Sequence, residues 1–247
     1  MICLLFRDHD ADYLEHLNQR LNGIEVAFCP VLETQDAKAD WDSVALGSTQ
    51  NIIISSKRAV QALNRTHHLP ALKDKNFYVV GPSTLAYLRL SLGNNAEGNF
   101  VREMSSALLA TRITSTITNS ETAEFVYFCA AGRRDELPDM LKQAGIKCTE
   151  LVVYETVPIK NIELPPELGL EERCILVFFS PSGVDAVWSR ISQFSQQCFF
   201  VCIGATTAHH LRQKCSTHAT VVVAKSPNVD GVCDAILSVV SKLSKIQ

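Results

Sequence analysis

One stretch of the chain, from Gly145 to Thr156, has a counterpart far upstream from Gly23 to Thr34, and this repeat constrains the fold more than any other feature. Both copies open with Gly-Ile and close with Glu-Thr at the same spacing. Each copy follows a predicted helix, so its glycine lies just past a helix C-terminus, where a positive φ costs glycine little. The apolar, β-rich residues that come next predict a strand in each copy.

The repetition extends beyond these two strands. Residues 52–60 match residues 176–184 in pattern, and residues 77–84 match residues 200–207. In each case an apolar strand ends in small or hydroxyl residues and leads into a helical pattern. Strands that alternate with helices predict an α/β fold with largely parallel sheets. The chain is therefore expected to hold two copies of one α/β unit, although the pattern alone leaves open which segments pack together.

The rest of the chain also shows alternating strand and helix patterns, broken by polar links. Residues 24–33 are predicted to form one strand and residues 101–116 one helix, although the latter contains several weak helix formers. Residues 93–98 and 118–124 are predicted to be loops, because Gly, Asn, Ser and Thr cluster there. Residues 158–173 carry Pro-Pro and a glycine, which predicts an irregular surface link.

Composition and charge exclude several classes of protein. The 247 residues are 47% hydrophobic and 20% charged, which is typical of a globular enzyme with a substantial core. A net charge of −3 gives no general attraction to nucleic acid or to anionic membranes. The first residues become charged too soon for a signal peptide, and no apolar run reaches transmembrane length. We therefore expect a cytoplasmic protein with no nucleic-acid or membrane partner.

Cysteine and histidine spacing argues against a metal site. The nine cysteines lie mostly in apolar runs, form no Cys-x-x-Cys pair, and are odd in number, which favours buried reduced thiols. His67-His68 and His209-His210 are adjacent pairs whose side chains diverge. The chain also lacks the Gly-x-Gly-x-x-Gly and Gly-x4-Gly-Lys-Ser/Thr patterns, which argues against dinucleotide and P-loop chemistry. No metal ligands are predicted.

Four turns between a predicted strand and a predicted helix are rich in hydroxyl or small residues. They are Ser55-Ser56, Gly81-Pro82-Ser83-Thr84, Ser180-Pro181-Ser182-Gly183 and Gly204-Ala205-Thr206-Thr207. In an open parallel sheet, ligands bind beyond the carboxyl ends of the strands, where such turns lie. Helix N-termini also offer free N–H groups and a positive dipole end, which suit a carboxylate or a phosphate.

A simpler role exists for each of these turns. Serine and threonine are preferred N-caps, and for any single turn capping is the commoner role. Four such turns repeated across two halves favour a shared anionic ligand in a cleft. Arg133, in another strand-to-helix turn, can fork onto a carboxylate or can form a solvated pair with Asp135 or Glu136. Arg58, beside Lys57, poses the same alternatives.

Tyr154 is the aromatic residue of interest in the later copy of the repeated strand. Val152, Tyr154 and Thr156 share one face of that strand. By itself a tyrosine in this position is more often a packed strand aromatic than a catalytic acid. No Ser-His-Asp arrangement or pair of catalytic acids is readable elsewhere in the chain.

Taken together, several stretches resemble the uroporphyrinogen-III synthase family. They are Ser55-Ser56-Lys57-Arg58-Ala59-Val60, Tyr78-Val79-Val80-Gly81-Pro82-Ser83-Thr84, Val153-Tyr154-Glu155-Thr156, Phe178-Phe179-Ser180-Pro181-Ser182-Gly183 and Ile203-Gly204-Ala205-Thr206-Thr207-Ala208. The resemblance covers nearly the whole chain, although each motif is short and degenerate. Family members often have Ser-Pro-Arg where Ser56-Lys57-Arg58 stands here, which leaves the role of Lys57 open.

The resemblance implies a fold of two similar flavodoxin-like α/β domains with parallel sheets. The chain of such a protein leaves the first domain, completes the second and then returns. The implied ranges are 1–32 with 160–247 for the first domain, 37–153 for the second, and 29–36 with 152–159 for two connecting strands that form a β-ladder. The active site implied by the resemblance is the cleft between the domains.

The resemblance also implies an activity without any cofactor. The substrate is a small molecule, the linear tetrapyrrole polycarboxylate hydroxymethylbilane, which is cyclised to uroporphyrinogen III with inversion of ring D and loss of water. Tyr154 is the implied general acid. The implied substrate contacts are Ser55, Ser56, Arg58, Gly81, Ser83, Thr84, Arg133, Ser180, Ser182, Gly204, Thr206 and Thr207. The competing interpretation is a cytosolic two-domain module that binds an anion without catalysis, and a monomer is expected in either case.

Overall fold

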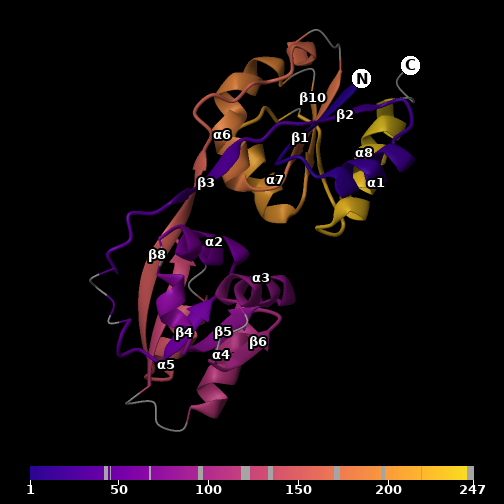
Figure 1. The fold of residues 1–247 in the computed structure, drawn as a ribbon. Coiled ribbons are helices and arrows are strands. Elements are labelled where there is room, and N and C mark those ends of the chain that lie inside the picture. The colour runs from indigo at the N-terminus through magenta and orange to yellow at the C-terminus, as the bar shows by residue number, and fades with distance from the viewer. Residues whose placement is uncertain are drawn as a thin grey trace. The chain divides into compact units, whose positions relative to one another are not determined.

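A computed structural model of the chain describes ten stretches (Figure 1). They are residues 1–41, 44, 46–66, 68–93, 97–117, 123–132, 136–169, 173–195, 198–217 and 219–243. The chain divides into two compact units. Unit 1 joins Met1–Glu33 to Val157–Gln247, and unit 2 is the single segment Thr34–Thr156. Unit 1 is thus made of the two ends of the chain.

Unit 1 is built on a five-stranded parallel sheet with the order β11-β10-β9-β1-β2. Its strands are β1 (Ile2–Phe6), β2 (Glu25–Phe28), β9 (Cys174–Phe178), β10 (Cys198–Cys202) and β11 (Val221–Val223). Its α-helices are α1 (Ala11–Arg20), α6 (Pro181–Ile191), α7 (Ala205–Arg212) and α8 (Val229–Leu243), with short 3₁₀ turns at Pro166–Gly169 and Ser192–Phe194. Five consecutive fully buried residues in β1, and five in β9, show that these strands are covered on both faces.

Unit 2 is built on a six-stranded sheet with the order β3-β8-β7-β4-β5-β6. Its strands are β3 (Leu32–Asp36), β4 (Asn51–Ile54), β5 (Asn76–Val80), β6 (Phe100–Glu103), β7 (Glu124–Ala130) and β8 (Lys147–Pro158). Its α-helices are α2 (Lys57–Arg65), α3 (Pro82–Leu92), α4 (Ser106–Thr116) and α5 (Glu136–Gln143), with a 3₁₀ turn at Leu69–Leu72. The five strands from β8 to β6 are all parallel to their neighbours.

The two units share one strand arrangement. The strands β1, β2, β9, β10 and β11 of unit 1 correspond in spatial order to β7, β8, β4, β5 and β6 of unit 2. Counted along the chain, the sheet of unit 1 has the order second, first, third, fourth, fifth, which is the flavodoxin-like order. Unit 2 has the same spatial arrangement of equivalent strands, but β4, β5 and β6 come before β7 and β8 in its chain, which is a circular permutation. The predicted α/β fold with parallel sheets is therefore confirmed. The equivalent strands β2 and β8 each begin directly after the Gly-Ile pair of the repeated stretch.

Two strands carry the chain from one unit to the other. The β3 strand lies beside β8 in the sheet order. The amide of Ala37 donates to the carbonyl of Val153, and the amide of Ile159 donates to the carbonyl of Val31. The residue numbers of the bonded partners fall along one strand as they rise along the other, so the two strands run in opposite directions. Both crossings therefore occur within one hydrogen-bonded ladder.

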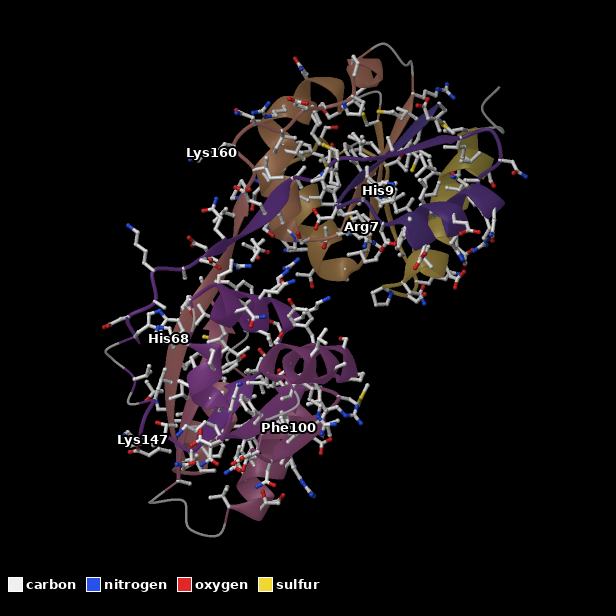
Figure 2. All side chains as sticks on the ribbon, viewed as in Figure 1. Arg7, His9, His68, Phe100, Lys147 and Lys160 are labelled. Carbon is white, nitrogen blue, oxygen red and sulfur yellow. The ribbon has the colours of Figure 1, made fainter. Side chains whose placement is uncertain are left out.

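Two predicted elements were wrong. Residues 24–33 form two strands rather than one, because Pro30 lacks the amide hydrogen that a continuous ladder needs between β2 and β3. Residues 101–116 form the strand β6 and then α4, capped by Ser105, rather than one helix. The short β6 strand, which holds the Phe100 labelled in Figure 2, escaped detection because it lies at the sheet edge. Phe100, Val101 and Glu103 are half-buried there and Arg102 is exposed, so the pattern is weak.

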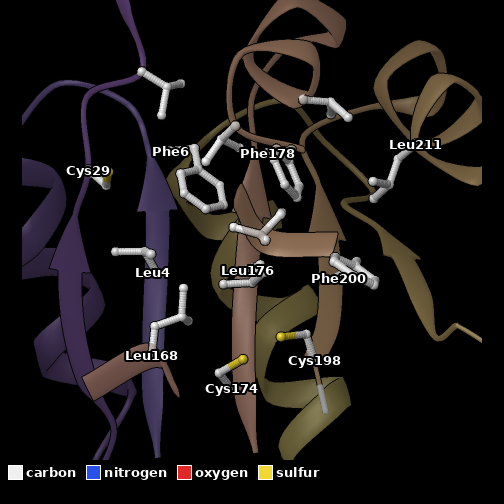
Figure 3. Close-up of a cluster of buried hydrophobic side chains, with 14 of the residues drawn as sticks. Leu4, Phe6, Cys29, Leu168, Cys174, Leu176, Phe178, Cys198, Phe200 and Leu211 are labelled. Carbon is white, nitrogen blue, oxygen red and sulfur yellow. The ribbon is translucent and has the colours of Figure 1, made fainter. Parts of the chain in front are cut away.

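The core of unit 1 fills both faces of its sheet. On one face, Phe6, Phe178 and Phe200 from three neighbouring strands pack side by side, with Phe6 and Phe178 ring centroids 4.8 Å apart (Figure 3). On the other face, the apolar stripe of α8 packs against residues of β1, β9 and β10.

All nine cysteines are free thiols, and burial raises the pKa of Cys202 to about 12, so this thiol stays protonated.

The Phe178→Ala variant tests this core. Phe178 is fully buried, so the change removes contacts and leaves a cavity that its rigid neighbours fill poorly. We expect the free energy of unfolding of unit 1 to fall by about 3–5 kcal/mol. In a Trp41→Phe background, urea denaturation followed by the fluorescence of Trp188, whose ring centroid lies 6.2 Å from that of Phe200, reports on unit 1. The Leu90→Ala control, at a side chain 78% exposed, should change little, and equal effects would contradict the prediction.

Candidate active site

The four predicted turns all lie at carboxyl ends of parallel strands. In unit 2 they follow the neighbouring strands β4 and β5, and in unit 1 they follow the neighbouring strands β9 and β10. Each turn leads directly into the first turn of a helix, namely α2, α3, α6 and α7. Each unit thus presents two helix N-termini side by side at the edge of the sheet where ligands of this fold class bind.

Tyr154 and Ser56 form the best-defined pair among the predicted residues. The hydroxyl groups of Tyr154 and Ser56 lie 2.9 Å apart, and the Ser56 oxygen accepts a hydrogen bond from the amide of Ala59 at 3.1 Å. Tyr154, a residue of β8, is only 8% exposed, because its ring packs in the core of unit 2. A tyrosine hydroxyl is therefore held at the N-terminus of α2 by the residue that caps the helix.

A second tyrosine, Tyr127, contacts the neighbouring residue of the same turn. Its hydroxyl lies 2.8 Å from that of Ser55. Tyr127 packs in the apolar cluster on the other face of the sheet from Tyr154, so the end of β4 has a tyrosine–serine pair on each face. Tyr127 stands in a continuous apolar, buried run along β7, so from the sequence it resembles a packing residue.

The glycine turns carry a buried threonine in each unit. Thr84 and Thr207 lie in the first turns of α3 and α7 and are 5% and 3% exposed. Within the described ranges, neither threonine hydroxyl hydrogen-bonds another residue. Gly81 has φ 83°, a left-handed value that favours glycine, and its amide donates to the carbonyl of Glu103 at 2.8 Å. Gly204 has extended backbone, a conformation open to any residue, so the backbone does not require glycine at this position.

The serine turn of unit 1 supports the simpler role of capping. The Ser180 oxygen accepts a hydrogen bond from the amide of Gly183 at 3.0 Å and lies 3.1 Å from the Ser182 hydroxyl. Both serine side chains therefore interact within the turn itself. Ser182, like Ser83 and Thr206 in the glycine turns, is exposed. These three exposed side chains can reach a ligand without any loss of helix capping.

Of the two arginines predicted to contact the substrate, the structure describes Arg58 but not Arg133. Arg58 is exposed on the first turn of α2, and it has no ion pair with any residue in the described ranges. The neighbouring Lys57 places its ammonium 4.7 Å from the centre of the Tyr87 ring, which orients it along α3. Arg133 lies outside the described residues. The described part of the chain contains no group of three or more His, Cys, Asp or Glu side chains arranged to hold a metal ion.

A comparison with known protein families identifies the chain. The family model for "Uroporphyrinogen-III synthase HemD" matches residues 13–234, which is most of the sequence. The chain belongs to the uroporphyrinogen-III synthase family. This finding confirms the resemblance that the strand-to-helix turns carried.

Individual relatives agree with the family match. The chain is 26% identical to the uroporphyrinogen-III synthase of Saccharomyces cerevisiae, with 89% of each chain covered. It is similar in structure to a uroporphyrinogen-III synthetase from Helicobacter pylori, with a TM-score of 0.63, 21% identity, and coverage of 97% of this chain and 100% of the other. It is also similar to a mutant uroporphyrinogen III synthase from Thermus thermophilus, with a TM-score of 0.53, 13% identity, and coverage of 98% and 100%. At these identities the two structures support the fold.

The two serines of the unit 1 turn allow capping to be separated from ligand contact in this uroporphyrinogen-III synthase. Ser180→Ala removes the acceptor of the Gly183 amide, so we expect the free energy of unfolding of unit 1 to fall by about 1 kcal/mol. Ser182→Ala removes no cap and should change it by less than about 0.5 kcal/mol. In the Trp41→Phe background, urea denaturation followed by the fluorescence of Trp188, which lies on the same helix, measures both. A larger loss for Ser182→Ala would show that the cap is assigned to the wrong serine.

Proposed function

We propose that this chain cyclises hydroxymethylbilane to uroporphyrinogen III, with ring D inverted through a spiro intermediate and one water lost. The family match supports the overall reaction, and the Tyr154–Ser56 hydroxyl pair at the N-terminus of α2 supports the chemical step. The pair is the observation that carries the mechanism, because it is a proton donor held in a fixed place at the ligand-binding edge of a parallel sheet.

One arrangement of the hydrogens around Tyr154 suits proton donation to the substrate. The Ser56 oxygen accepts the Ala59 amide hydrogen, and the Ser56 hydroxyl hydrogen is then free to point at the Tyr154 oxygen. The Tyr154 hydroxyl hydrogen is left to donate to the departing hydroxyl of the bilane. As the carbon–oxygen bond breaks, the pyrrole nitrogen supplies the electron pair, and the Tyr154 proton converts the hydroxyl to water. An N-protonated azafulvene cation and a Tyr154 phenolate remain, and the proton that ring D loses when the macrocycle closes restores the Tyr154 hydroxyl. The positive end of the α2 dipole stabilises the negative charge that develops on Tyr154.

Ring D then attacks the azafulvene carbon to give the spiro intermediate, which fragments and closes in the inverted orientation. This bilane also cyclises without an enzyme, to the type I isomer. The protein therefore has to select a conformation as well as help the hydroxyl leave. Holding reacting atoms close and aligned supplies several kcal/mol of barrier reduction, and often about 7 or more.

The strand-to-helix turns help to select the substrate conformation by binding the carboxylates of the tetrapyrrole. We assign carboxylate contacts to the helix N-termini after Ser56, Gly81, Ser180 and Gly204, where amide N–H groups lack partners within the helix. The Thr84 and Thr207 hydroxyls, both without a partner in the described ranges, add one donor to each unit. Arg58 adds a cation beside the Ser56 turn, and Arg133 remains a proposed contact from the sequence alone.

The state and location of the protein are proposals as well. None of the helices in the described ranges has the length and apolar character needed to span a bilayer. We propose a monomer in the cytoplasm that works without cofactor or metal. A non-catalytic anion-binding module, the competing interpretation, is not favoured by the family match.

The products formed from hydroxymethylbilane test the proposed function. The protein is incubated with freshly prepared bilane, the porphyrinogens are oxidised, and the type I and type III isomers are separated by chromatography. Excess type III over the spontaneous reaction supports a synthase. An isomer ratio equal to that of buffer alone would reject the proposal and leave a binding module.

Tyr154→Phe tests the proton donor. We expect kcat to fall by about 100-fold or more while KM changes little, because the variant loses a transition-state proton donor and keeps the ring in the core. Thermal unfolding should show a folded protein. Tyr87→Phe, which removes a tyrosine hydroxyl elsewhere in unit 2, should keep the wild-type kcat. A wild-type kcat in folded Tyr154→Phe would exclude Tyr154 as the general acid.

Thr84→Val and Thr207→Val test the equivalent contacts in the two units. Valine keeps the shape of the buried side chain and removes only the hydroxyl, so each variant should raise KM by about 3- to 10-fold or lower the fraction of type III product. Thr111→Val, at an exposed position of α4, serves as the control. Wild-type KM and isomer ratio in both variants would contradict the assigned contacts.

A further inference from the structure

The sheet of unit 1 has a topological switch point between β1 and β9. None of the substrate contacts predicted from the sequence lies at the end of β1. From β1 the chain moves to β2 on one side, whereas β9, β10 and β11 lie on the other side. In open parallel sheets, ligands bind at the carboxyl ends of the two strands that flank such a reversal. Here those strands are β1 and β9. The Ser180 turn follows β9, and Arg7 is the first residue after β1.

Arg7 is held in place by two aromatic rings. Phe6 pairs in register with Phe178, so Arg7 and Phe179 leave the sheet at the same level. The Arg7 guanidinium carbon lies 5.0 Å from the centre of the Phe179 ring and 4.4 Å from the centre of the Tyr13 ring (Figure 2). Such contacts fix the plane of a guanidinium without using its N–H groups.

The hydrogen-bonding capacity of Arg7 is largely unused. One terminal nitrogen donates to a carboxylate oxygen of Asp10 at 3.1 Å, and the guanidinium also interacts electrostatically with the Tyr13 hydroxyl. A guanidinium has five N–H donors, so a second carboxylate can be accommodated. The Arg7 side chain is 29% exposed, which leaves it accessible to a ligand.

The polar side chains that contact Arg7 are Asp10 and Tyr13, and Asp10 is the one that carries a charge. Asp10 is itself fixed, because its other oxygen accepts the amide of Tyr13 as the N-cap of α1. Burial raises the pKa of Tyr13 to about 12, so its ring stays uncharged at neutral pH. A single, partly exposed carboxylate therefore balances the Arg7 charge.

We propose that Arg7 is a substrate-positioning residue that binds one carboxylate of the tetrapyrrole through its free N–H groups, beside the Ser180 turn at the β1/β9 switch point. The inference rests on the proposed function and adds a residue to it. A guanidinium with a fixed plane suits a carboxylate, since two parallel N–H bonds can form at once. The simpler interpretation is an exposed ion pair with Asp10, which stabilises proteins by at most about 1 kcal/mol and affects no substrate.

Three variants separate these interpretations. Arg7→Gln removes the charge, Arg7→Lys keeps the charge but loses the fork, and Arg20→Gln removes an arginine that pairs with Asp234 at 2.7 Å on the surface of the same unit. With hydroxymethylbilane as substrate, we expect Arg7→Gln to raise KM by about tenfold or more, Arg7→Lys to lie between it and wild type, and Arg20→Gln to match wild type. KM should also rise less steeply with salt in Arg7→Gln than in wild type.

The outcomes are distinct from those that test the proposed function. If wild type forms excess type III isomer and Arg7→Gln keeps a KM within about twofold of Arg20→Gln, the Arg7 inference is overturned and the proposed function stands. If wild type gives only the spontaneous isomer ratio, both fail. Circular dichroism checks folding, and should Arg7→Gln unfold, Arg7→Lys decides the question, because it retains a cation over the two rings. A wild-type KM in Arg7→Lys then overturns the inference.

Discussion

Parallel strand pairing is the constraint on which the rest of this structure depends. Because neighbouring strands run in the same direction, every strand of a unit's parallel sheet ends at one edge, and the helices that follow begin there. The Ser56, Gly81, Ser180 and Gly204 turns gather at these edges for that reason alone. Anion binding then needs no dedicated constellation of charges, since helix N-termini supply donors that have no partner within the helix.

The uses of these turns differ from one residue to another. Ser56 and Ser180 serve as helix caps, so their oxygens are occupied, while the Thr84 and Thr207 hydroxyls have no partner within the described part of the chain. In the Tyr154–Ser56 pair, the serine that caps α2 also hydrogen-bonds the tyrosine hydroxyl. A residue that stabilises a helix thus fixes the place of the group that we propose as the proton donor.

Much of the fold could be read from the sequence because it is repeated. The strands at β4 and β9 carry the same apolar run and the same hydroxyl turn, so one copy supports the other. The edge strand β6 has no such support, since half-buried residues give a weak pattern, and Pro30 interrupts a run whose composition is otherwise strand-like. The contacts of Arg7 and Tyr127 could not be predicted from the sequence, because their neighbours Phe179 and Ser55 come from other strands and are remote in sequence.

The division of the chain has a consequence for its synthesis. Unit 2 is a single segment, so it can complete its sheet while later residues are still being translated. Unit 1 cannot, because β1 must wait for the central strand β9 to pair with its open side. The apolar strand β1 and the helix α1 therefore complete their packing only after the strands β9, β10 and β11 have been synthesised.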